Sequence, residues 1–134
     1  MQARVLSSVA ALAVLLGAPP LLAHHSFAAE FDASKSVKLR GTVTRMEWTN
    51  PHVWIYLDVP SPDEKTVSWA IEADAPNAMF RQGFRTNVAQ PGTVMVVEGY
   101  RAKNGTSTAK AMKVSLPDGH VLFVRSPEHP QPPK

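Results

Sequence analysis

The stretch VKLRGTVT, Val37 to Thr44, decides the fold of this chain. Apolar residues and a glycine alternate in it with basic residues and threonines, which is the period of two expected of a strand with one buried face. Gly41 stands in the middle of the stretch. A strand that serves both sheets of a small barrel must bend sharply, and a glycine or a bulge allows that bend. The stretch therefore predicts the first strand of a small barrel.

The residues that follow continue this pattern. Further stretches with strand-like composition lie at 53–59, 67–73, 94–100, 109–116 and 120–125. Asn104-Gly105, between the fourth and fifth of the six strands, predicts a type I′ hairpin, a turn that needs positive φ at both central residues. In this arrangement the residues expected to point into one core are Val43, Ile55, Leu57, Trp69, Ile71, Val94 and Val96.

One segment breaks the β pattern. Asp74 can cap a helix N-terminus, Pro76 falls in the first turn, and Gly83 can end the helix. Met79 and Phe80 are expected to close one end of the core. Three strands, a helix and a further hairpin follow the element order of the OB fold. The sequence thus predicts a mostly β fold, a small OB-fold-like barrel of five to six strands with one short helix between strands three and four; the alternative is an open β-sandwich.

The N-terminus has the order of a secretory signal peptide. A short basic start precedes an apolar run, Val5 to Leu16, and the small residue Ala23 follows a proline pair. The run is shorter than the roughly 20 residues of a membrane-spanning helix, and the absence of cysteine excludes lipid attachment and disulfides. We therefore expect export to the periplasm with loss of residues 1–23, which leaves one barrel domain over 24–125 without a transmembrane segment and a disordered proline-rich tail over 126–134.

The net charge and the absence of catalytic motifs argue against two classes of function, nucleic-acid binding and catalysis. Removal of the signal peptide lowers the formal net charge from +3 to +2, because Arg4 is the only charged residue in it. A near-neutral surface argues against a nucleic-acid-binding protein. No phosphate-binding glycine loop, nucleophile elbow or two-histidine metal helix is present, which predicts a non-enzymatic protein. The acidic pairs Asp63-Glu64 and Glu72 with Asp74 are expected in solvated turn and helix-cap positions.

Five histidines are the candidate metal ligands, because imidazole binds copper, zinc and nickel well. Cleavage after Ala23 would give His24 a free α-amino group beside its own imidazole, with His25 next to it. Cleavage after Leu22 would instead make His25 the third residue of an Ala-His-His start, which can wrap Cu(II) in amine, amide and imidazole nitrogens. Either product can bind copper without the fold, so the alternatives are an adventitious N-terminal binder and a selected site that closes with a third ligand from the domain.

His52 is the candidate third ligand. It follows Asn50-Pro51 at the connection between strands one and two, where a loop side chain can reach the mouth of the barrel. The alternative is that its ring N–H caps the turn. His120 is expected at the same end of the barrel as His52, if the strands simply alternate in direction, and would extend the metal site. His129 lies in the proline-rich tail and is expected to be solvated.

Aromatic and basic residues suggest a second site. The candidate ligand-binding residues are Trp48, Asn50, Trp54, Tyr56, Arg101 and Lys103. A barrel face with such aromatics can stack sugars or bases, with charge supplied from the hairpin loop. Outside the cytoplasm the ligand would be an envelope glycan, a peptide or a partner protein. The alternative is that Trp54 and Tyr56 cover the far side of a thin sheet as ordinary packing.

Several segments of the mature chain also resemble a known family. The segments are HHSFAAEFD (24–32), LRGTV (39–43), EWTNPH (47–52), Trp69, GYRAK (99–103) and LPDG (116–119), of which the first and third are the most specific. They resemble a family of small exported proteobacterial proteins known as domain of unknown function 6152. The resemblance implies export and a compact β domain, and it supplies no catalytic residues.

These features predict a non-enzymatic periplasmic binding or accessory protein that binds copper through its N-terminal histidines. The alternative is a metal-free OB-like module that binds an envelope glycan, a peptide or a partner protein. A copper enzyme built around His24 is a third interpretation, although the sequence shows no substrate cleft.

The position of cleavage is the first testable prediction. Mass spectrometry of the exported protein should show an N-terminus at His24, because Ala23 is the best small residue after the apolar run. Retention of Met1 in the exported protein would contradict the assignment of a signal peptide.

Overall fold

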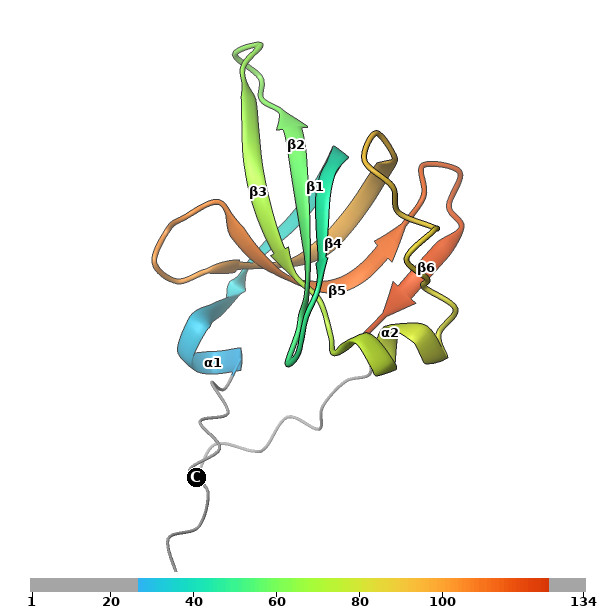
Figure 1. Ribbon diagram of the computed structural model, residues 1–134. Coiled ribbons are helices and arrows are strands. Elements are labelled where there is room, and N and C mark those ends of the chain that lie inside the picture. Colours follow the sequence, from blue (N-terminus) through green and yellow to red (C-terminus); the bar gives the residue numbers. More distant parts are fainter. Residues whose placement is uncertain (1–26, 126–134) are drawn as a thin grey trace, which may run out of the picture.

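A computed structural model describes residues 27–125 of the chain (Figure 1). Its elements in chain order are α1 (Phe27–Glu30), β1 (Phe31–Trp48), β2 (Val53–Pro60), β3 (Thr66–Glu72), α2 (Pro76–Arg81), β4 (Val94–Ala102), β5 (Thr108–Ser115) and β6 (Val121–Val124). The expected signal peptide, the candidate ligands His24 and His25, and the proline-rich tail with His129 lie outside the described residues. No helix within residues 27–125 is long and apolar enough to cross a membrane.

The strands close into a ring. Hydrogen bonds join them in the order β3-β2-β1-β4-β5, and a parallel pairing of β3 with β5 completes the circle. β6 pairs only with β5 and extends the sheet beyond the ring. A five-stranded barrel with a helix between its third and fourth strands is the OB fold. The expected fold class is therefore confirmed; the single turn of α1 was not expected.

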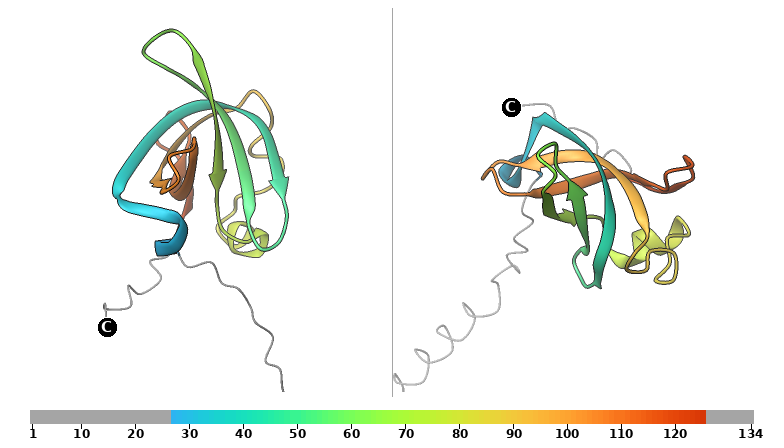
Figure 2. Two further views of the ribbon diagram at one scale, coloured as in Figure 1. Left: turned by 90° about the vertical axis from the view of Figure 1, so that its left-hand side faces the viewer. Right: turned by 90° about the horizontal axis from the view of Figure 1, so that it is seen from above.

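β1 is longer than the expected strand at 37–44 because it pairs with two neighbours. Its first part pairs with β4 and its last part with β2, and the change of partner falls at Thr42. The left view of Figure 2 shows β1 curving around the barrel. A Cβ atom on Gly41 would lie 2.7 Å from the carbonyl oxygen of Asp58, closer than two such atoms can approach. Gly41 therefore allows β1 and β2 to converge where β1 changes partner.

The inward faces of the ring strands form the core. Four of the residues expected there are at most 1% exposed: Val43, Ile55, Leu57 and Ile71. Trp69, also expected in the core, is half-buried and packs against its edge. The period-two pattern thus identified the inward faces of β1, β2 and β3 correctly.

The expected register of β4 is wrong by one residue. Met95 and Val97 are fully buried, whereas Val94 and Val96 are only half-buried. Met95 pairs with Gly41, which lies on the inward side of β1, so the pairing decides which face of β4 enters the core. These four consecutive apolar residues show no alternation, and the sequence pattern therefore does not reveal the inward face.

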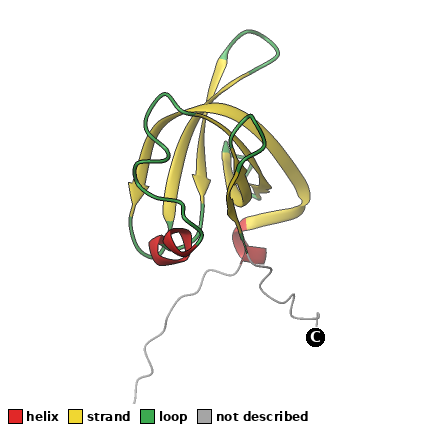
Figure 3. Ribbon diagram, turned by 90° about the vertical axis from the view of Figure 1, so that its right-hand side faces the viewer, coloured by secondary structure: helices red, strands yellow, loops and turns green. Residues whose placement is uncertain are grey.

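α2 and the loop after it close one end of the barrel (Figure 3). Met79 is fully buried as expected, and Phe80 is half-buried. Phe84, in the loop, is also fully buried and was not expected there. Gly83 has a φ of 86° and its N–H donates to the Phe80 carbonyl, so this glycine ends the helix as expected.

The hairpin between β4 and β5 forms where it was expected, but it is not a type I′ turn. Gly105 has a φ of 78°, whereas Glu64 is the only non-glycine residue with positive φ among the described residues. Asn104 therefore does not adopt the expected conformation. Its Oδ1 instead accepts hydrogen bonds from the N–H of Thr106 at 3.1 Å and from the Thr106 hydroxyl at 2.7 Å. Asn104 thus shapes the loop through its side chain.

The close approach at Gly41 gives a prediction for stability. Gly41→Ala should lower the free energy of unfolding by about 1–3 kcal/mol, because the main chain must shift to admit the methyl group. Thr42→Ala, at the neighbouring exposed position, is the control and should change it by roughly 0.5 kcal/mol or less. Urea denaturation measures both changes. Equal stability of the Gly41 variant and the wild type would show that the strands tolerate a side chain at this crossing.

Candidate functional site

A buried ion pair lies where β3 meets β5. Glu72 ends β3 and pairs in register with Lys110 near the start of β5. Their side chains are 8% and 4% exposed, and Lys110 Nζ lies 2.8 Å from Glu72 Oε1. Lys110 Nζ also donates to the Ala73 carbonyl at 2.8 Å. Glu72 was expected in a solvated position; that expectation is wrong, because the in-register lysine balances its charge away from water.

His52 adds a third group to this pair. Its Nδ1 lies 2.8 Å from Glu72 Oε1, the oxygen that Lys110 also contacts. Burial lowers the pKa of His52 below its usual value of 6.5, the charge of Lys110 lowers it further, and the nearby carboxylates of Glu72 and Asp74 oppose this shift. His52 is therefore neutral at pH 7, and its hydrogen bond to a carboxylate requires the proton on Nδ1. Nε2 keeps a free lone pair for a ligand.

The ring of His52 does not cap its turn, which was the alternative role. The Thr49 hydroxyl donates to the His52 carbonyl oxygen at 3.1 Å and stabilises the turn instead. Two backbone hydrogen bonds of 2.9 Å, from Val53 N–H to the Asp74 carbonyl and from Ala73 N–H to the Val53 carbonyl, tie the end of this loop to the end of β3. The loop therefore holds the imidazole beside Glu72.

Asp74 lies on the outer side of this group and does not cap α2. The N-cap of α2 is Ala75, and no side-chain hydrogen bond caps the helix. Asp74 Oδ1 lies 3.6 Å from Arg125 Nε and 4.0 Å from Lys110 Nζ. Two carboxylates, two cationic side chains and one imidazole thus balance one another. We call His52, Glu72, Asp74, Lys110 and Arg125 the Glu72 cluster.

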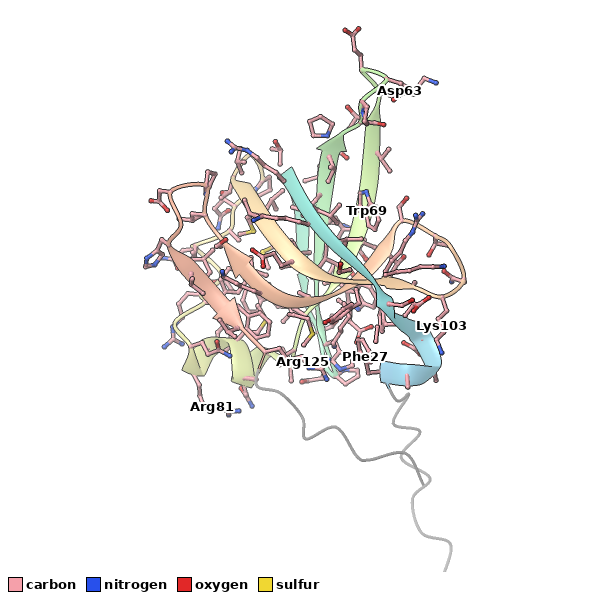
Figure 4. All side chains as sticks on the ribbon, turned by 180° about the vertical axis from the view of Figure 1, so that it is seen from behind. Phe27, Asp63, Trp69, Arg81, Lys103 and Arg125 are labelled. Carbon is pink, nitrogen blue, oxygen red and sulfur yellow. The ribbon has the colours of Figure 1, made fainter. Side chains whose placement is uncertain are left out.

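The N-terminal segment is anchored to the hairpin between β4 and β5. The Phe27 ring lies 5.7 Å from that of Phe31 and 5.6 Å from that of Tyr100, centroid to centroid. Lys103 donates a hydrogen bond from Nζ to the Ala28 carbonyl. Figure 4 shows Phe27 and Lys103 at the same end of the molecule, beside α1. The start of the described chain is therefore held at a defined place on the barrel.

A pocket of about 380 Å³ separates this segment from the Glu72 cluster. Residues 29–31 line one part of it, and residues 102–104 with Thr108 line another. Trp54 and Glu72, paired across β2 and β3, complete the lining. The pocket thus combines an aromatic wall with a buried carboxylate and a polar hairpin, and it includes Trp54 and Lys103 from the expected ligand site.

The structure does not bring His120 to His52. His120 lies in the exposed turn before β6, where its N–H donates to Asp118 Oδ1 at 2.9 Å. The Glu72 cluster meets β5 near its start, at Lys110, whereas His120 follows the other end of β5, roughly 20 Å further along the strand. The expected pairing of these two histidines is therefore wrong. Within residues 27–125, no group of three or more His, Asp or Glu side chains is arranged to hold a metal ion.

The three aromatic residues of the expected ligand site do not lie on one face of the sheet. Trp48 packs against the core, and its ring stacks on Phe80 at 5.1 Å, so it serves packing at the end closed by α2. Trp54 lies on the opposite side of the sheet from Trp48. It shares that side with its partners on the neighbouring strands, Glu47 and Glu72. Tyr56 shares that outer side but donates its hydroxyl to Glu47 at 3.1 Å. Of the three aromatics, Trp54 alone lines the pocket.

Of the three remaining residues of the expected ligand site, Lys103 alone lines the pocket. The Arg101 guanidinium lies 5.4 Å from the Trp69 ring centre and donates to the carbonyls of Gly105 at 2.7 Å and Thr106 at 3.1 Å, so it stiffens the hairpin. Lys103 lines the pocket, as described above. Asn50 is exposed in the loop before His52 and does not line the pocket.

Glu72, Lys110 and Arg125 were not among the expected site residues. A lysine flanked by Ala109 and Ala111 in an apolar strand is a signal for a buried charge, because lysine is almost never fully buried unless it is paired. Its partner lies 38 positions earlier in the chain. Only the parallel contact of β3 with β5 identifies that partner.

The buried ion pair gives a second stability prediction. Lys110→Met should lower the free energy of unfolding by about 3–5 kcal/mol, because it leaves Glu72 without its buried countercharge. The pKa of His52, followed by NMR titration, should rise in this variant, because the lysine charge that lowers it is gone. Lys113→Met, on the same strand but 42% exposed, is the control and should cost roughly 1 kcal/mol or less. An unchanged stability in the Lys110 variant would contradict a structural role for the pair.

No curated protein matches this chain. The chain is similar to a crystal structure of TiaS in complex with a tRNA and ATP, with 26% identity, a TM-score of 0.46, and coverage of 60% of this chain and 18% of that one. It is also similar to a mitochondrial single-stranded DNA binding protein from S. cerevisiae, Rim1, with 13% identity, a TM-score of 0.48, and coverage of 62% and 94%. This chain thus spans about a fifth of the TiaS chain. The model of the family of unknown function DUF6152 matches residues 11–111, most of the sequence, and the protein therefore belongs to that family.

Proposed function

We propose that this protein is exported to the periplasm and acts there as a non-enzymatic binding or accessory protein for copper. The proposed ligands are the α-amino group and imidazole of His24, freed by cleavage after Ala23, together with Nε2 of His52. His25 follows His24 in the sequence and is a further candidate ligand. The amine and imidazole nitrogens are a donor set that suits Cu(II).

The observation that carries this proposal is the hydrogen bond from His52 to Glu72. A metal-binding histidine almost always donates its second ring N–H to a carboxylate, a carbonyl or a water, which sets the tautomer and the ring orientation. His52 has this arrangement at 2.8 Å, and burial keeps its pKa low, so the imidazole is neutral and ready to bind without losing a proton. Lys110 balances the charge of Glu72, and the hydrogen bond from Nδ1 leaves Nε2 as the ring nitrogen with a free lone pair.

The anchoring of the N-terminal segment supports the same assignment. Phe27 is packed against Tyr100, and the three residues from His24 to Phe27 can span at most about 10 Å when extended. The anchored segment and Glu72 line the same pocket, and His52 contacts Glu72. One pocket is thus bordered both by the start of the described chain and by the carboxylate that His52 contacts, which supports a ligand set drawn from both.

Titration of Cu(II) tests the proposal. Isothermal titration calorimetry at pH 7 should give a roughly tenfold or greater loss of affinity for His52→Ala, because a ligand is removed. One additional residue before His24 should also weaken binding, because it displaces the free amine. Affinity should fall for the wild type below pH about 6.5, where the His24 imidazole becomes protonated.

His120→Ala is the matched control, because His120 is an exposed histidine at the far end of β5. It should bind Cu(II) with the affinity of the wild type. Equal affinities for the wild type, the extended protein and the His52 variant would reject a selected copper site and would favour the alternative function, a module that binds a partner without a metal.

A further inference from the structure

The pocket beside the Glu72 cluster offers an acceptor that the cluster does not use. Both His52 and Lys110 contact Oε1 of Glu72. No fully buried side-chain oxygen or nitrogen among the described residues lacks a hydrogen-bond partner. The second carboxylate oxygen, Oε2, makes none of these contacts within residues 27–125, so it is not fully buried, and it is the free acceptor of a residue that lines the pocket. A carboxylate oxygen in this position accepts a hydrogen bond from whatever fills the pocket.

The charge balance of the cluster decides which kind of donor suits this oxygen. Lys110 Nζ already lies 2.8 Å from the carboxylate of Glu72, and the lining holds one further acidic and one further basic residue, Glu30 and Lys103, whose charges offset each other. A cationic ligand would therefore meet a site whose negative charge is already balanced. A neutral hydroxyl can donate to Oε2 without adding a charge. The pocket thus favours a neutral hydroxyl donor over an amine.

The hairpin wall presents further hydrogen-bonding groups. Asn104 uses its Oδ1 to accept from Thr106, which leaves the amide N–H groups of Asn104 as donors. The Thr108 hydroxyl lies 3.1 Å from the Thr106 hydroxyl, and because a hydroxyl both donates and accepts, it can form a further hydrogen bond to a ligand. Both Asn104 and Thr108 line the pocket. A ligand there needs acceptors as well as donors at its edge.

Trp54 supplies an aromatic surface of the pocket, which Ala29, Phe31 and Ala102 also line. It lines the space next to Glu72, with which it pairs across β2 and β3. An indole ring in a half-open pocket offers a flat apolar face on which a ligand ring can stack. The ligand is therefore a ring with an apolar face and an edge that both donates and accepts hydrogen bonds.

We propose that this pocket binds a saccharide ring. The C–H groups of one sugar face would stack on Trp54, one hydroxyl would donate to Glu72 Oε2, and other hydroxyls would form hydrogen bonds with Asn104 and Thr108. The volume of about 380 Å³ lies in the range of small-ligand pockets. This binding requires no metal and goes beyond the proposed copper site.

Ligand-observed NMR on the metal-free protein, treated with a chelator, tests this assignment. The probes are glucose and N-acetylglucosamine as free sugars, a tetramer of each as a glycan segment, and putrescine as an amine of similar size. At least one sugar should bind with a Kd of about 10 mM or lower. Tighter binding of the tetramer than of its monomer would identify a glycan as the source, and equal binding would identify a free sugar.

Variants show whether the sugar occupies this pocket. Trp54→Ala should weaken binding roughly tenfold or more, because it removes the stacking surface. Tyr56→Ala is the matched control, two positions along the same outer face of β2 but outside the pocket, and should bind normally. Thr108→Val conserves side-chain shape and should weaken binding severalfold, which gives a second test if the tryptophan variant does not fold.

The result that overturns the proposal is the absence of binding by all four sugars, or tighter binding of putrescine than of any of them. Equal sugar binding by the wild type and by the folded Trp54 and Thr108 variants would also reject this pocket. His52→Ala should bind the sugar normally, because Oε2 and Trp54 remain in place. The failure of copper binding and the failure of sugar binding are therefore distinguishable.

Discussion

The short parallel contact between β3 and β5 is the constraint on which the rest of the structure depends. It consists of three residue pairs, and the last of them joins Glu72 to Lys110. The middle pair, Ile71 with Ala109, is fully buried in the core. Without this contact the five strands would form an open sheet whose ends are unpaired. Ring closure thus brings a buried apolar pair and a buried charge pair together at one seam.

The same closure organises the functional groups. A carboxylate that loses its solvent must be satisfied within the protein, and Glu72, which lines the pocket, gathers Lys110 and His52 around one of its oxygens. The proposed metal ligand, His52, therefore contacts the residue that supplies the proposed sugar acceptor, Glu72. The two proposed ligands contact different atoms, Nε2 of His52 and Oε2 of Glu72.

Most of the fold could be predicted because strand alternation, turn residues and glycines act locally. Val43, Ile55 and Ile71 are buried as the period of two requires, and α2 lies between the third and fourth strands. The errors fall where local patterns are ambiguous. The apolar run at Val94–Val97 has no alternation, and Asn104 can shape a turn through its side chain as readily as through its backbone.

The sequence by itself determined the OB-like element order, the special place of Gly41 in the first strand and His52 as a candidate ligand, because each follows from residues adjacent in the chain. Only the tertiary structure decided that Glu72 is buried, that Lys110 faces it across 38 positions, and that His120 lies at the far end of β5. Charge pairing and burial depend on which distant strands become neighbours, and that choice is made by the closure of the barrel as a whole.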